Sequence, residues 1–235
     1  MARCSVFMPG KHIAHLETRS GAVIDAVVIE GGREEARYWH QNVHLPYIAK
    51  SPDFRLDRNW NWPRLVSWCY IHERLWGRDT AFFQINVKDT GGFAFPVGQI
   101  FVSDGYPFFP GEDQPSIFLW YLTAAPKTAL VDHGLPPDLK LMRPLVDIAI
   151  QFGFQRGYNG LLTLHAATCR SLLKDKKFAT KEDMDLYSKY EKGVCLIPYA
   201  EPSLFIRWLR RNDGRYFYTD ENRALDLTTK LDYLR

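Results

Sequence analysis

A run of strand, loop, helix and strand between residues 116 and 166 constrains the fold of this chain most strongly. The apolar segment 116–123 predicts a strand, and residues 144–156 carry apolar side chains at helical spacing. Residues 161–166 repeat the apolar strand pattern after the glycine-containing turn 157–160. This order predicts a βαβ unit, in which the helix begins beside the end of the first strand.

Two basic residues at the start of the predicted helix indicate a ligand. Lys140 and Arg143 lie at the positive end of the helix dipole, where cations are unfavourable unless an anion is bound. Helix N-termini in βαβ units commonly bind phosphate through backbone amides. We therefore expect a phosphate-bearing ligand at this position.

The rest of the chain predicts short strands and helices around this unit. Before it, strands are expected at 22–30, 81–87 and 93–102, and helices at 34–43 and 63–76. After it, we expect a helix at 181–192, a strand at 194–199 and a terminal hairpin that turns at 212–214. The fold class is therefore α+β with a mixed sheet.

Bulk properties exclude several classes of protein. A net charge of +3 over 235 residues does not favour nucleic-acid binding, and no apolar run is long enough to span a membrane. The four cysteines have no paired short spacing, which argues against a disulfide framework or a zinc knuckle. His40 and His44 are four residues apart but lack a third ligand, so no metal is expected. We expect a cytoplasmic protein of unknown oligomeric state.

Several local phrases, in their order, resemble the GCN5-related N-acetyltransferase (GNAT) superfamily. They are 95–102 with its Gly98, 123–126 ending in Pro126, 144–153, and 157–166. The resemblance covers about residues 93–200. It implies an acetyltransferase-like, mostly antiparallel twisted sheet that is splayed at its centre and flanked by helices. The chain would be a single domain with a divergent N-terminal part (1–90), an acyl-CoA-binding core (91–200) and a C-terminal hairpin (201–235).

The resemblance also implies an activity: an acyl-CoA-dependent N-acyltransferase that transfers an acetyl group from acetyl-CoA to an amine. The acceptor would be a small molecule or a protein. Main-chain groups of Leu122, Thr123 and Ala124 would hold the pantetheine. The pyrophosphate would be bound by the side chains and helix amides of Lys140, Leu141, Met142 and Arg143.

The chain departs from the family pattern at two places. The phosphate loop of the family is rich in glycine, whereas residues 138–143 contain none, so Lys140 and Arg143 would replace lost backbone contacts or the site has been abandoned. The family's tyrosine acid has no counterpart at the usual spacing, where Leu173 stands. Tyr190 is the candidate acid, with Tyr187 as an alternative, and His165 is the candidate base or pocket residue.

These departures leave two other functions open. One is a catalytically inactive relative that uses the fold for binding or regulation. The other is an acyltransferase with a longer acyl chain or a carrier-protein donor, for which the long 127–137 loop leaves room. Trp60 and Trp62 are candidates for an acceptor pocket, whereas Trp68 and Trp76 are expected in the core.

Overall fold

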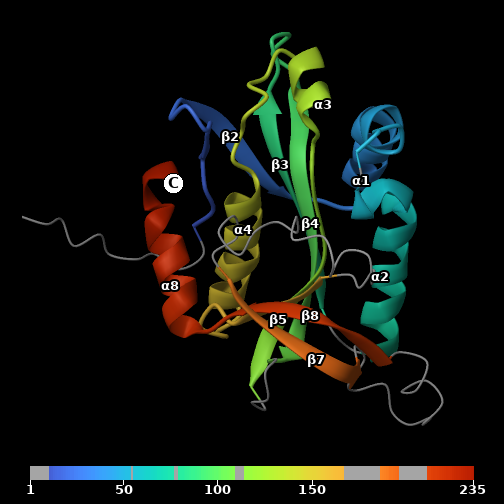
Figure 1. Ribbon diagram of the computed structural model, residues 1–235, viewed down its shortest axis with the longest axis vertical. Coiled ribbons are helices and arrows are strands. Elements are labelled where there is room, and N and C mark those ends of the chain that lie inside the picture. Colours follow the sequence, from blue (N-terminus) through green and yellow to red (C-terminus); the bar gives the residue numbers. More distant parts are fainter. Residues whose placement is uncertain (1–10, 54, 77–78, 109–113, 167–185, 196–210) are drawn as a thin grey trace, which may run out of the picture.

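One mixed sheet runs through the computed structural model, which describes residues 11–53, 55–76, 79–108, 114–166, 186–195 and 211–235 (Figure 1). The strand order is β1-β2-β3-β4-β5-β6-β8-β7, and among the strand pairs of these described residues only β5 and β6 are parallel. The strands are β1 (His15–Glu17), β2 (Val23–Glu30), β3 (Thr80–Lys88), β4 (Ala94–Pro107), β5 (Pro115–Ala124), β6 (Leu162–Ala166), β7 (Tyr187–Cys195) and β8 (Arg211–Thr219).

Helices cover both faces of this sheet. On one face lie α1 (Arg33–Trp39) and α2 (Trp62–Trp76), and on the other lie α4 (Met142–Gln155) and α8 (Glu221–Lys230) (Figure 1). The short α3 (Lys127–Asp132) follows β5. The chain also has a π-helix at His40–Ile48 and short 3₁₀ helices at Leu56–Asn59 and Asp232–Leu234. The fold is α+β, with a mostly antiparallel sheet between two helical layers.

Helix α4 is the centre of the core on its face of the sheet. Leu145, Val146 and Ile148 are fully buried, as expected for a crossover helix that packs directly on strands. Gly98 of β4 allows this close approach, because a Cβ at that position would lie 3.0 Å from a methyl carbon of Leu145. The helix therefore cannot move away from the sheet without exposing the core.

The sequence predictions for the middle of the chain are confirmed. β5, α4 and β6 form the predicted βαβ unit, and β3 and β4 form the predicted hairpin. The helix expected at 63–76 is α2, although Trp68 on it is 52% exposed and does not belong to the core. The 127–137 segment, expected to be a loop, contains α3.

The predictions for the C-terminal part are partly wrong. Residues 187–192 belong to strand β7 rather than to a helix, and the turn expected at 212–214 lies inside β8. Those two strands pair across an irregularity between Glu191 and Val194, so sheet pairing overrides the local turn signal. The expected hairpin is replaced by β8 and α8; residues 167–185 and 196–210 lie outside the described residues.

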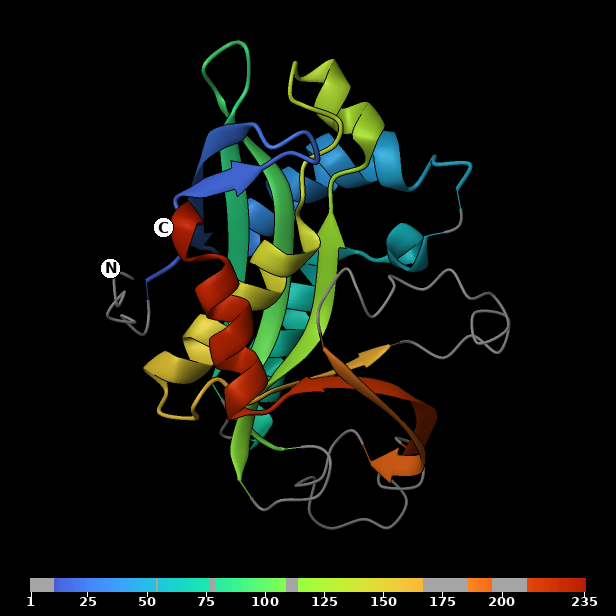
Figure 2. The same cartoon turned by 60° about the vertical axis from the view of Figure 1, so that its left-hand side comes forward.

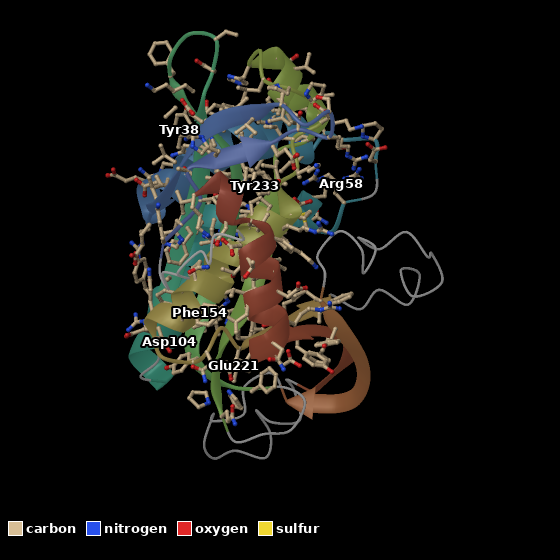
Figure 3. The ribbon with its side chains drawn as sticks, turned by 90° about the vertical axis from the view of Figure 1, so that its left-hand side faces the viewer. Tyr38, Arg58, Asp104, Phe154, Glu221 and Tyr233 are labelled. Atoms are coloured by element: carbon tan, nitrogen blue, oxygen red, sulfur yellow. The ribbon has the colours of Figure 1, made fainter. Side chains whose placement is uncertain are left out.

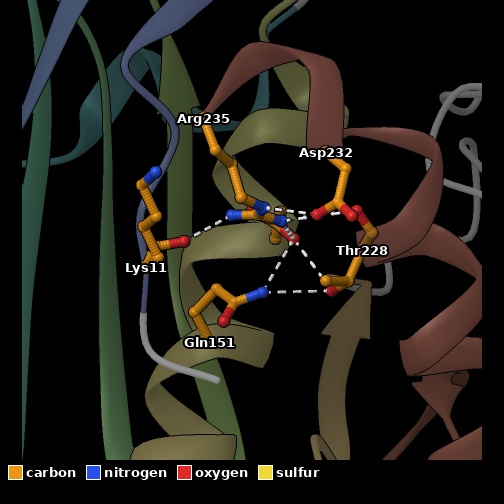
Figure 4. Close-up of polar contacts among 6 residues, drawn as sticks. Lys11, Gln151, Thr228, Asp232 and Arg235 are labelled. Atoms are coloured by element: carbon orange, nitrogen blue, oxygen red, sulfur yellow. Dashed lines mark hydrogen bonds and ion pairs between the residues drawn. The ribbon is translucent and has the colours of Figure 1, made fainter. Parts of the chain in front are cut away.

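A buried polar cluster ties the end of the chain to α4. Asp147 on α4 is fully buried and accepts hydrogen bonds from Arg235 at 2.8 Å and from Thr228 at 3.0 Å (Figure 4). Burial raises the pKa of the Asp147 carboxyl, and the bonds from Arg235 and Thr228 oppose that rise. Arg235 also pairs with Asp232 at 3.2 Å, which fixes the last turn.

Arg235→Ala should lower the free energy of unfolding by about 3 kcal/mol, because it leaves a buried carboxylate without its counter-ion. Asp232→Ala is the matched control, since Asp232 is partly exposed and its loss keeps the Arg235–Asp147 pair; about 1 kcal/mol or less is expected. Urea unfolding at pH 7 measures both. Equal losses for the two variants would contradict this role of the cluster.

Candidate functional site

A bulge in β5 opens the sheet beside it. Phe101 of β4 pairs with Tyr121, but the next residue, Val102, pairs with Leu119, so Trp120 is an extra residue in β5. Beyond this point β5 has left its parallel neighbour, since β6 pairs with β5 only from Ile117 to Leu119. Figure 2 shows the yellow-green end of β5 rising away from the gold strand β6. The sheet is therefore splayed at its centre, as the family resemblance implies.

Along an antiparallel strand, the backbone N–H and C=O groups of successive residues point alternately toward and away from the neighbouring strand. This alternation shows which groups of β5 point into the opening. Ala125 donates its N–H to Val97 at 2.8 Å, so Thr123, two residues back, also faces β4 with its backbone groups. The N–H and C=O groups of Leu122 and Ala124 consequently point away from β4. Within the described strands no partner pairs with this edge, so it can receive an extended ligand.

Thr123 has a different part in the site from Leu122 and Ala124. Its hydroxyl donates a short hydrogen bond to Asp57, which also forms a bidentate pair with Arg55 at 2.7 and 2.9 Å. Arg55 donates a further bond of 2.9 Å to the carbonyl of Ala124. This Arg55–Asp57 clamp fixes the end of β5 and occupies one outward-pointing carbonyl, which leaves both groups of Leu122 and the N–H of Ala124.

Aromatic side chains pack against β5 around Tyr121. The ring of Tyr121 lies 5.0 Å from that of Trp60 and 6.2 Å from that of Trp62, both edge-on. Trp62 is fully buried and belongs to the core, so only Trp60 and Tyr121, which are partly exposed, are available to line a pocket.

A cavity of about 410 Å³ lies where α4 begins. All four residues predicted to bind phosphate, Lys140 to Arg143, line it. It is completed by Glu17, the last residue of β1, by Arg19 just after that strand, and by residues at and after the end of α8, which are Lys230, Leu231, Tyr233 and Leu234. Figure 3 labels Tyr233, which lies beyond the end of α8. The volume is in the range of small-ligand sites.

Glu17 is the carboxylate in this cavity, and it holds two of its neighbours. Lys140 donates to Glu17 at 2.7 Å, and the Tyr233 hydroxyl donates to the same oxygen at 2.7 Å. The hydrogen bond from Lys140 lowers the pKa of Glu17, with a second contribution from Tyr233. Burial, together with the bond to Glu17, raises the pKa of Tyr233 to about 12. Glu17 is thus an anion at neutral pH and already pairs with one of the cations that a phosphate would use.

The two predicted catalytic residues lie on the far side of the opening. His165 is in β6 and pairs with Tyr216, whereas Tyr190 is in β7 and pairs with Arg215. Because β8 separates β6 from β7, their backbones are about 10 Å apart. Their roles stay predictions, as does the binding of phosphate by residues 140–143.

The two histidines of the π-helix lie against each other. His40 and His44 stack with their ring centroids 4.9 Å apart, and burial lowers the pKa of both. Among the described residues no group of three or more His, Cys, Asp or Glu side chains could hold a metal ion. No helix in the described part of the chain is long and apolar enough to cross a membrane.

Sequence reasoning missed the residues that come to the site from distant segments. Arg19 and Lys230 are charged residues near element ends, which carry no local signal of a cavity. Arg55 and Asp57 are two residues apart in a segment expected to be irregular, and only the fold brings them to β5.

Comparisons with known proteins support the fold alone. No protein-family model matches this chain, and no curated protein has significant sequence similarity to it. Among solved structures, the chain is similar to one described as apo FdhC, a nucleotide-linked sugar GNAT, with a TM-score of 0.50 and 9% identity. The match covers 95% of this chain and 98% of that one. The chain therefore has a GNAT fold with a strongly divergent sequence.

The Arg55–Asp57 clamp can be tested by a double-mutant cycle. Arg55→Ala should cost about 3 kcal/mol of unfolding free energy, because Asp57 is 6% exposed and would lose its counter-ion. The double variant Arg55→Ala/Asp57→Ala should lose less than the sum of the single changes by about 1 kcal/mol or more. Additive losses in chemical denaturation would contradict the clamp.

Proposed function

We propose that this protein is an acyltransferase that takes an acyl group, with acetyl the expected one, from a CoA thioester to an amine. The observation that carries the proposal is the open edge of β5 together with the basic cavity at the start of α4, the helix that packs on β5. An acyl-CoA has one part for each of these features. Its amide-containing pantetheine can pair with a strand edge, and its phosphates are attracted by the cations of the cavity.

The main-chain groups of Leu122 and the N–H of Ala124 would bind the pantetheine amides as an added strand would. Thr123 would support this edge through its bond to Asp57 and not by pairing itself. Lys140 and Arg143, with the first amides of α4, would bind the pyrophosphate. These side chains would replace the backbone contacts that a glycine-rich loop makes. They would thus compensate for the absence of glycine from residues 138–143.

The reaction asks little of the side chains. The acceptor nitrogen forms a bond to the thioester carbon as the carbon–sulfur bond breaks, one proton leaves the nitrogen and another reaches the thiolate. We assign the first proton transfer to His165 and the second to Tyr190, both on strands across the opening from β5. Trp60 and Tyr121 would offer the acceptor an aromatic surface.

Isothermal titration calorimetry with acetyl-CoA tests the proposal. We expect binding, and a loss of about tenfold or more in the affinity of Lys140→Ala/Arg143→Ala, because two charged contacts to phosphate are removed. The control is Arg37→Ala/Arg64→Ala, which removes the same charge from exposed positions of α1 and α2 on the other face of the sheet. No heat with folded wild-type protein at millimolar acetyl-CoA would favour the catalytically inactive binding protein instead.

Glu17→Gln should raise the affinity for acetyl-CoA several-fold at low salt, because it frees Lys140 and removes a carboxylate that repels phosphate. The lowered pKa of Glu17 means that the carboxylate stays charged as the pH falls to its ordinary titration range and is protonated only below it. The gain should therefore be equal at pH 6 and pH 8. Weaker binding by Glu17→Gln would mean that Glu17 positions Lys140 for the ligand.

A further inference from the structure

The cavity at the start of α4 has two basic walls rather than one. Lys140 and Arg143 form the first, beside the first turn of α4. Arg19, at the end of β1, and Lys230, the last residue of α8, form the second. These four cations come from three separate parts of the chain, so their gathering is a property of the fold.

The second wall is held in place by the backbone. The N–H of Arg19 bonds the carbonyl of Asp138 at 3.0 Å, and Thr18 bridges to Leu139, so the end of β1 is fastened to the segment that leads into α4. After Lys230, the buried Leu231 and Leu234 anchor the turn that carries Tyr233. Arg19 and Lys230 are both exposed residues that line the cavity, so a ligand there can contact them.

The charge in the cavity exceeds what one phosphate group needs. Four cations and the single carboxylate of Glu17 give a formal charge of +3 among the residues that line it. Lys230 also pairs with Asp226 at 2.7 Å, which holds the side chain and offsets part of its charge. Like charges around one cavity repel one another, so this arrangement favours a ligand with several negative charges spread over its volume.

We propose that Arg19 and Lys230 bind the 3′-phosphate of the donor's adenosine, separately from the pyrophosphate on Lys140 and Arg143. The inference rests on the proposed function and refines it, because it assigns a further phosphate of the donor to two residues outside the predicted phosphate site. A CoA thioester carries a pyrophosphate and a 3′-phosphate, whereas the phosphopantetheine of a carrier protein has a single phosphodiester. The two basic walls select the free CoA thioester.

The experiment compares acetyl-CoA with acetyl-dephospho-CoA, which lacks only the 3′-phosphate, by calorimetry on the full chain. For Arg19→Ala/Lys230→Ala we expect about a tenfold weaker binding of acetyl-CoA and an unchanged affinity for acetyl-dephospho-CoA. For Lys140→Ala/Arg143→Ala the affinities for both ligands should fall by the same factor. Arg37→Ala/Arg64→Ala again controls for the loss of two positive charges, and thermal unfolding shows that each variant is folded.

The possible failures are distinct. If Arg19→Ala/Lys230→Ala weakens both ligands equally, the second wall binds the pyrophosphate and the proposal is wrong. If that variant binds both ligands as the wild type does, the second wall does not contact the donor, which also overturns it while leaving the proposed function intact. If wild-type protein binds neither ligand, the acyl-CoA function itself falls, and this inference with it.

Discussion

The extra residue in β5 is the feature on which the candidate site depends. Because Trp120 has no counterpart in β4, the strand bends, and β5 pairs with β6 over only three residues. The indole N–H of Trp120 bonds the hydroxyl of Ser103 at 2.8 Å, which holds the bulge in one conformation. Without the bulge the parallel pairing of β5 with β6 could continue past Leu119, and the edge that we assign to the donor would be less open.

An open strand edge inside a protein must find hydrogen-bond partners, since unpaired backbone groups are costly when water is excluded. Arg55 satisfies the Ala124 carbonyl and is itself neutralised by Asp57. The groups that remain at Leu122 and Ala124 therefore explain why an amide-containing ligand suits this place. In the cavity at the start of α4, Glu17 performs the corresponding role for charge, because it pairs with Lys140, one of the cations that we assign to phosphate.

The sequence predicts the parts of this site that depend on local patterns. The βαβ unit follows from two apolar strands and an amphipathic helix, and the cations at the start of α4 follow from their place in that pattern. The second basic wall could not be found this way, since Arg19 and Lys230 meet only through the fold. The β7–β8 pair was missed because Asn212–Gly214 is a strong turn signal that long-range pairing overrides. Helix α8 did carry a signal, the N-cap Asp220, whose side chain accepts from the N–H of Arg223.

Amide hydrogen exchange, resolved to single residues on the free and acetyl-CoA-bound protein, tests most directly whether the outward edge of β5 is the donor site. Pairing with pantetheine should slow the exchange of the amides that point into the opening, at Leu122 and Ala124. The Thr123 amide, already bonded within the sheet, should change little. Unchanged exchange at Leu122 and Ala124 under saturating acetyl-CoA would contradict the account, because the ligand would then bind without using the opened strand.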